Sequence, residues 1–215
     1  MTEHDWDQKL NIKTTGRDDK HADQFHHPYE PTPYCVLERL RDSGYITKDS
    51  VLIDYGCGKG RVGFFLAKEL GCRCIGLEYD PPIFEQAKEN LLTFLSQTPE
   101  KTVFKEQSIF SKHLSFLCEN AEKYEVTDAD CFYFFNPFTV EILRSVMQKI
   151  ISSYYENPRP MKLFFYYPDP EYVSYLLTGD NSGMLDELYF LDEIDCRDLF
   201  DGNDEREKIM IFELG

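Results

Sequence analysis

The stretch Val51–Gly63, VLIDYGCGKGRVG, contains an apolar run that ends near Asp54 and continues into three glycines at alternate positions, Gly56, Gly58 and Gly60. In open α/β sheets, a buried strand leading into a glycine-rich loop and then a helix brings bare backbone against a polar cofactor. The stretch therefore predicts an α/β protein with a cofactor-binding turn at the end of a buried strand.

Two classes of cofactor compete for this loop. Residues Gly58–Gly63 match G-x-G-x-x-G, the dinucleotide fingerprint, in which the first glycine directly follows the strand and a helix N-terminus faces a pyrophosphate. Here Asp54 precedes that first glycine by four residues, and its carboxylate would repel the phosphates in a partly dehydrated pocket. An NAD(P)-dependent oxidoreductase is therefore the alternative and not the preferred interpretation.

Read as Asp54-x-Gly56-x-Gly58-x-Gly60, the segment resembles motif I of the class I S-adenosylmethionine-dependent methyltransferases. The resemblance implies a seven-stranded, mostly parallel α/β sheet with helices on both faces and an antiparallel C-terminal hairpin. It also implies S-adenosyl-L-methionine as the cofactor, with Asp54 near its methionine ammonium. Cys57 and the glycines are expected against the cofactor, where larger side chains would block the approach.

A second acidic residue supports this interpretation. The short β-like run Cys74–Asp80 carries Glu78, 24 positions after Asp54, with Tyr79 directly after it. A carboxylate at this strand end can accept hydrogen bonds from both ribose hydroxyls of the cofactor, so Glu78 and Tyr79 are expected at the nucleoside end of the pocket. The alternative for Glu78 is a solvated strand end.

Segments with strand and helix periodicity alternate along the chain, which indicates a parallel sheet with helices on both faces. The expected strands are 51–55, 73–78, 102–107, 130–135, 161–167, 187–192 and 208–213, and the expected helices are 33–43, 60–70, 82–95, 139–155 and 169–177. Residues 108–128 are expected to form a polar, partly helical link. The last two strands have little helix between them, as in the closing hairpin of a methyltransferase sheet.

The chain is expected to divide into an N-terminal arm over residues 1–32 and a cofactor-binding domain over residues 33–215. The arm is polar, carries scattered charge and shows no helical periodicity, which is typical of a mobile segment. In class I methyltransferases a leading segment often folds over the cofactor, so Tyr29 or Tyr34 is expected to reach it as part of a lid. The alternative is that these rings pack on the core.

The candidate for the chemistry follows the apolar strand 130–135, at the sheet edge where open α/β folds bind ligands. Asn136-Pro137-Phe138 resembles the (D/N)PP(Y/F) signature of methyltransferases that act on amines and amides, with one proline instead of two. The Asn136 amide oxygen and the Pro137 carbonyl are expected to accept hydrogen bonds from a substrate N–H, with Phe138 beside a planar or cationic group. The alternative is that Asn136 caps the next helix.

Two further strand ends supply candidate residues. Gln107 and Ser108 end the expected third strand, where family members commonly contact adenine, although a turn or cap by Ser108 is the alternative. Tyr166, Tyr167 and Asp169 end another strand on the same edge and are expected either to line a substrate cavity or to pack in the core.

Composition limits the partners and the compartment. The 39 acidic residues outnumber the 23 basic ones and give a net charge of −16, which disfavours nucleic-acid substrates. The seven cysteines are interpreted as reduced core residues, and neither they nor His21, His26 and His27 show the spacing of a metal site. No apolar run reaches membrane-spanning length and the N-terminus does not resemble a signal peptide, so a cytoplasmic protein is expected.

The sequence thus predicts a methyltransferase that acts on a nitrogen or oxygen nucleophile of a small molecule or a protein. A catalytically silent domain that binds a partner through its acidic segment 192–205 is a further alternative, although such a segment is more often a solvated hairpin tip. The identity of the acceptor and the oligomeric state are left open.

Overall fold

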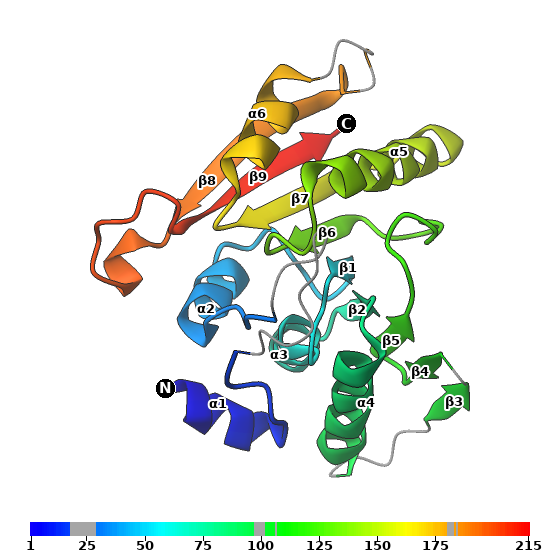
Figure 1. The fold of residues 1–215 in the computed structure, drawn as a ribbon, viewed down its shortest axis with the longest axis vertical. Helices are drawn as coiled ribbons and strands as arrows, with labels where there is room; N and C mark the ends of the chain where they lie inside the picture. Colours follow the sequence, from blue (N-terminus) through cyan, green and yellow to red (C-terminus); the bar gives the residue numbers. More distant parts are fainter. Residues whose placement is uncertain (18–28, 97–101, 106, 180–182, 184) are drawn as a thin grey trace.

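A computed structural model of the protein describes residues 1–17, 29–96, 102–105, 107–179, 183 and 185–215. Within these residues the chain forms one nine-stranded sheet of order β3-β4-β5-β2-β1-β6-β7-β9-β8 (Figure 1). The strands are β1 (Val51–Tyr55), β2 (Arg73–Glu78), β3 (Val103–Lys105), β4 (Ser108–Phe110), β5 (Leu114–Cys118), β6 (Cys131–Phe134), β7 (Met161–Tyr166), β8 (Leu188–Asp195) and β9 (Lys208–Leu214). The helices are α1 (Glu3–Leu10), α2 (Tyr34–Asp42), α3 (Arg61–Leu70), α4 (Pro81–Leu95), α5 (Val140–Glu156), α6 (Pro170–Thr178) and the short 3-10 helix η1 (Arg197–Leu199).

The centre of the sheet is parallel and is buried on both faces. β1 pairs in parallel with β2 and β6, and the parallel ladder continues to β5 on one side and to β7 on the other. Neighbouring residues of β1 enter different apolar clusters: Leu52 joins the cluster that contains residues of α1 to α4, and Ile53 joins the cluster that contains residues of α5 and α6. The expected parallel sheet with helices on both faces is therefore confirmed, and its strands are continuous apolar runs because both faces are covered.

The C-terminal strands close the sheet as an antiparallel hairpin. β9 runs antiparallel to β7 and to β8, and a bulge between Phe190 and Asp192 shifts the register of β8. This confirms the expected closing hairpin. None of the helices in the described ranges combines the length and the apolar character needed to cross a membrane.

One strand that was expected to be parallel is an antiparallel edge strand. β3 pairs antiparallel with β4, β4 pairs antiparallel with β5, and the parallel neighbour of β2 is β5, in the region expected to be a polar link. β5 alternates buried Leu114 and Phe116 with half-buried Ser115 and lacks the continuous buried run of β1 and β6, so its short pattern does not distinguish a strand from a helical turn. The described sheet therefore contains the seven expected strands, with β3 antiparallel at the edge, and two strands that were not expected, β4 and β5.

The N-terminal arm contains a helix that the sequence analysis did not predict. Thr2 and Asp5 form a reciprocal capping box at the start of α1, which then buries Trp6 and Leu10. The Trp6 ring stacks on Tyr34 with 5.6 Å between the ring centroids. An isolated helix of eight residues is marginal in water, so this packing and not local propensity stabilises α1.

The packing of α1 can be tested by truncating its aromatic anchor. We expect Trp6→Ala to lower the free energy of unfolding by about 3–5 kcal/mol, because it removes a fully buried large ring and leaves a cavity. Tyr155→Ala, which removes a ring that is 60% exposed on α5, is the matched control and should change it by less than about 1 kcal/mol. Denaturant unfolding measures both, and equal effects would contradict the role given to α1.

Candidate active site

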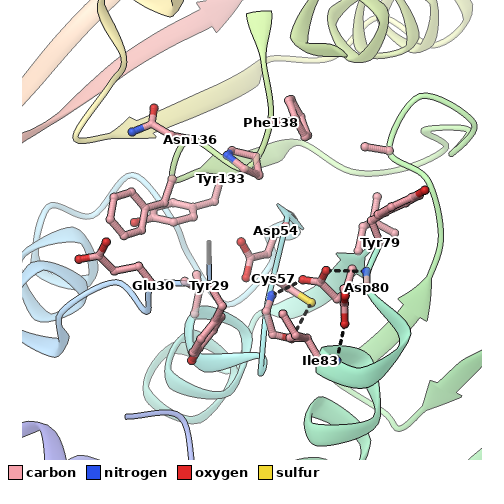
Figure 2. Close-up of a pocket in the computed structure, with 18 of the residues that line it drawn as sticks. Tyr29, Glu30, Asp54, Cys57, Tyr79, Asp80, Ile83, Tyr133, Asn136 and Phe138 are labelled. Atoms are coloured by element: carbon pink, nitrogen blue, oxygen red, sulfur yellow. Dashed lines mark hydrogen bonds between the residues drawn. The ribbon is translucent and has the colours of Figure 1, made fainter. Parts of the chain in front are cut away.

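A pocket opens at the sheet edge where the parallel strands β1, β2, β5 and β6 end (Figure 2). The segments that follow these four neighbouring strands line it, and a segment that precedes α2 covers it. The pocket residues are Asp54 of β1 with Gly56, Cys57 and Gly58 after it; Glu78 of β2 with Tyr79 and Asp80 after it; Ile83 of α4; Glu119, Asn120 and Ala121 after β5; Asn136, Pro137 and Phe138 after β6; and Tyr29, Glu30, Pro31 and Thr32 of the covering segment, among others.

The glycine loop allows two other segments to approach closely. Gly56 and Gly58 both have positive φ, 71° and 56°, which favours glycine. A Cβ atom on Gly56 would lie 2.4 Å from Cβ of Pro137, and one on Gly58 would lie 2.3 Å from the Tyr29 ring. These two glycines therefore bring the loop after β6 and the covering segment together around the pocket.

Asp54 is a buried carboxylate, and one of its two oxygens has no hydrogen-bond donor among the described residues. Its exposed fraction is 3%, and its Oδ2 atom accepts no hydrogen bond from any described residue. Burial, with a smaller contribution from the nearby Glu78, raises the pKa of Asp54 to about 8. An orphaned acidic oxygen at a pocket wall is costly in the unliganded protein, and a cationic group is its natural complement.

Glu78 ties the glycine loop to the turn after β2. Its Oε2 accepts a hydrogen bond from the Gly58 N–H at 2.8 Å, and its Oε1 accepts one from the Asp80 N–H at 2.9 Å (Figure 2). Asp80 in turn caps α4 by accepting from the Ile83 N–H at 2.9 Å. Burial raises the pKa of Glu78, and each of its carboxylate oxygens keeps a second lone pair for a ligand hydroxyl.

Asn136 is a clamp between the ends of β6 and β7. Its side-chain amide donates to the Tyr167 carbonyl at 2.7 Å and accepts from the Asp169 N–H at 2.9 Å. Both Asn136 and Tyr167 have left-handed backbone, with φ of 42° and 48°. Such conformations cost about 1–3 kcal/mol each in non-glycine residues and persist only where the surroundings enforce them.

This geometry changes the interpretation of Asn136. Its amide oxygen already accepts one protein hydrogen bond, so the side chain positions the loop, and a second lone pair remains on that oxygen for another donor. It also does not cap the following helix, because the N-cap of α5 is Thr139. Pro137 and Phe138, which Asn136 holds in place, line the pocket as expected.

Arg61, in the first turn of α3, fastens the covering segment. Its buried guanidinium donates to the Thr14 hydroxyl at 2.7 Å and to the Thr32 carbonyl at 3.1 Å, forms an ion pair with Glu3, and lies 4.2 Å from the centroid of the Tyr34 ring. Arg61 is not among the site residues predicted from the sequence. Its only local signal in the sequence is its position directly after Gly60, the last glycine of the loop.

Four of the expected cofactor-binding residues lie outside the pocket. Tyr34 is fully buried and donates to Asp7 at 2.7 Å, so it packs in the core as the alternative proposed, whereas Tyr29 lines the pocket. Gly60 starts α3, and a Cβ atom there would meet Phe116 at 2.7 Å.

Gln107 and Ser108 are the other two, and they are displaced by the unexpected topology. They lie where β3 turns into β4, and not at the end of a parallel strand. Glu119 to Ala121 follow β5 and occupy the pocket position that the sequence analysis assigned to Gln107 and Ser108. His21, His26 and His27 lie outside the described residues, and the described part of the chain contains no cluster of three metal-ligating side chains.

Comparison with known proteins gives one short sequence match. No protein-family model matches the sequence. Over 67 residues, 31% of this chain, the sequence is 31% identical to a protein-lysine N-methyltransferase of Saccharolobus islandicus (strain REY15A). The match spans 42% of the length of that relative.

Solved structures match most of the chain. An RNA methyltransferase from Salinibacter ruber in complex with S-adenosyl-L-homocysteine superposes with a TM-score of 0.54 at 18% identity, covering 86% of this chain and 94% of the other. The magnesium protoporphyrin IX methyltransferase from Synechocystis PCC 6803 with bound SAM gives a TM-score of 0.53 at 14% identity, covering 84% and 76%. The chain has the class I S-adenosylmethionine-dependent methyltransferase fold. In this methyltransferase fold the pocket described above lies at the carboxyl ends of the parallel strands, where open α/β sheets bind ligands.

The unpartnered Asp54 carboxylate should make the unliganded protein less stable as the pH rises. Its pKa is about 8 in the folded chain and about 3.9 when unfolded, so the stabilisation present below pH 4 is lost progressively towards pH 8. We expect Asp54→Asn to raise the melting temperature at pH 8 by several degrees and by much less at pH 5, since 1 kcal/mol corresponds to about 2–4 °C in a chain of this size.

Thermal unfolding at the two pH values measures this difference. Asp49→Asn, at a carboxylate whose side chain is 78% exposed, is the matched control and should show no such pH dependence. A melting temperature of Asp54→Asn equal to that of the parent at pH 8 would contradict the buried, unpaired state of Asp54.

Proposed function

We propose that this protein transfers a methyl group from S-adenosyl-L-methionine to a nitrogen or oxygen nucleophile. The observation that carries the proposal is the pair of buried carboxylates, Asp54 and Glu78, at neighbouring strand ends in one pocket. The cofactor carries a cationic sulfonium and an ammonium, which complement the orphaned Oδ2 of Asp54. A dinucleotide would instead place its diphosphate against the same carboxylates, which Coulomb repulsion in a dehydrated site disfavours.

Different pocket residues would contact different parts of the cofactor. Asp54 would hold the methionine ammonium, and Glu78 would accept the ribose hydroxyls on its remaining lone pairs. Ile83 and Ala121 would flank the adenine, with Asn120 available to its polar edge. When bound, the cofactor supplies an electrophilic methyl group, so the work of the chain is to align an acceptor with it and to exclude water.

A nitrogen acceptor is favoured over an oxygen acceptor. The segment Asn136–Phe138 resembles the signature of amine and amide methyltransferases, and the curated relative is named as a protein-lysine N-methyltransferase. RNA methyltransferases also share the fold, at 18% identity or less for those compared. The net charge of −16 disfavours a nucleic-acid acceptor, because sequence-independent binding to nucleic acid depends on basic residues.

Tyr29 is proposed as a lid over the cofactor. The pocket holds only about 100 Å³ of space, against the roughly 300–1,000 Å³ of typical small-molecule sites. The Tyr29 ring lies against Gly58, and its hydroxyl donates to the Thr14 carbonyl at 2.6 Å. Movement of this one ring away from Gly58 would widen the pocket, while Arg61 keeps Thr32 in place.

Calorimetric titration tests the choice of cofactor. We expect S-adenosyl-L-homocysteine to bind and NAD not to bind, and we expect Asp54→Asn and Glu78→Gln each to weaken binding by about tenfold to a hundredfold, because each removes a charged hydrogen-bond partner. Glu89→Gln, at an exposed position of α4, is the matched control. Binding of NAD alone, or unchanged affinity in both pocket variants, would overturn the proposal.

Cofactor binding should also release a proton. With a pKa of about 8, Asp54 is mostly protonated at pH 7 in the unliganded chain, and a cationic ligand requires its ionised form. Affinity should therefore rise between pH 6 and pH 8, and the binding enthalpy at pH 7 should depend on the ionisation enthalpy of the buffer. The Asp54→Asn variant should lose that buffer dependence. Its persistence in the variant would assign the proton to another group.

A further inference from the structure

A second cavity lies next to the cofactor pocket and shares its wall. It has a volume of about 520 Å³ and is lined by Glu30, Phe135, Asn136, Tyr166, Tyr167 and Glu207, among others. Glu30, Phe135 and Asn136 line both hollows. The two therefore meet at the loop after β6, where the acceptor of a transferred group would have to enter.

Aromatic rings form one side of this second cavity. The centroid of Phe135 lies 4.8 Å from that of Tyr166 and 6.4 Å from that of Tyr167. The guanidinium of Arg206 already lies 4.2 Å from the centroid of the Tyr167 ring, so an aromatic face in this cluster attracts a cation. Rings at this spacing suit an alkyl chain with a positive end.

Carboxylates supply the opposite charge. Glu207 is half-buried and accepts a hydrogen bond from the Tyr166 hydroxyl at 2.8 Å. Burial raises the pKa of Glu207. The nearby carboxylates of Asp204 and Glu30 raise it further, whereas the hydrogen bond from Tyr166 lowers it. Glu30 pairs with Arg17 at 3.4 Å, but both side chains are 55% exposed, so this pair is weak and can open to another cation.

The surroundings of the cavity are strongly acidic. Phe200 and Glu207, which line the cavity, belong to segment 192–207, and this segment carries eight acidic residues against two arginines. Several of these carboxylates have partners within the chain, such as Asp198 with Arg39, but the excess of negative charge remains. Such a field attracts a polycationic partner and repels an anionic one.

We infer that this second cavity binds the methyl acceptor, and that the acceptor is the alkylammonium side chain of a lysine in a basic protein segment. The inference rests on the proposed function and adds the place and the charge of the substrate. The aliphatic stem of the lysine packs on Phe135, Tyr166 and Phe200, and its ammonium lies between Glu207 and the shared wall. The acidic segment 192–207 contacts the flanking basic residues.

The chemistry balances without another reagent. The bound ammonium first loses one proton, which leaves to solvent through the mouth of the cavity. The nitrogen lone pair then forms a bond with the methyl carbon, the carbon–sulfur bond breaks, and its electron pair stays on sulfur. The products are a methylated ammonium and a neutral thioether, S-adenosyl-L-homocysteine.

Peptide binding to the protein saturated with S-adenosyl-L-homocysteine tests the inference. The probes are a basic peptide that contains one lysine among arginines, the same peptide with norleucine in place of the lysine, and free cadaverine. We expect the lysine peptide to bind about tenfold more tightly than the norleucine peptide, and Glu207→Gln to remove most of that difference. Phe200→Ala should weaken both peptides by severalfold, Glu89→Gln should change nothing, and all variants should keep the parent affinity for S-adenosyl-L-homocysteine.

The outcomes separate this inference from the proposed function. Equal binding of the lysine and norleucine peptides, with S-adenosyl-L-homocysteine bound normally, would overturn the inference and leave the proposed function standing. Tighter binding of cadaverine than of the lysine peptide would overturn the assignment to a protein and indicate a free polyamine. Failure of S-adenosyl-L-homocysteine itself to bind would overturn the proposed function.

Discussion

The architecture of the site depends on one unfavourable placement, a carboxylate at the end of β1 that is 3% exposed and has an oxygen without a partner. Water does not stabilise Asp54, and Glu78 on the neighbouring strand raises its pKa further. The protein tolerates this destabilisation because both strands are fixed by parallel pairing on each side. A binding site that is strained until its ligand arrives is the usual compromise between stability and function.

Two sets of polar contacts, which we call clamps, hold the loops around the Asp54 carboxylate in place. Arg61 connects the first turn of α3 to the segment that carries Thr14 and Thr32, and thereby holds the cover over the pocket. Asn136 connects the end of β6 to the end of β7 and fixes two residues in left-handed backbone. The first clamp positions the segment that covers the pocket, and the second positions the wall that the two cavities share. Loops are otherwise the most mobile parts of an α/β fold, so these bonds give the site its rigidity.

The glycines of the motif were expected to leave room for a cofactor, and in the structure they also leave room for other parts of the chain. Gly56 and Gly58 do lie at the pocket, but the atoms that a side chain would meet belong to Pro137 and Tyr29. The spacing Asp54-x-Gly56-x-Gly58 therefore encodes close approach between parts of the chain as well as room for a ligand. Gly60 serves the core, where it permits Phe64 and Phe116 to pack against the start of α3.

The sequence by itself determined the parallel α/β class, the closing hairpin and the residues at the ends of β1, β2 and β6, because apolar runs and a glycine loop are local signals. Only the tertiary structure decided that β5 and not β3 pairs with β2, since β5 lacks a continuous apolar run and is stabilised by its neighbours and not by its own pattern. The same reason explains α1, which forms by burying Trp6 against Tyr34, and the presence of the segment after β5, and not of Gln107 and Ser108, in the pocket lining. Contacts between distant parts of the chain leave the Oδ2 atom of Asp54 without a partner among the described residues, form the bonds of Arg61 and Asn136, and place some residues in the lining of both cavities. The pattern of residues along the sequence does not contain these contacts.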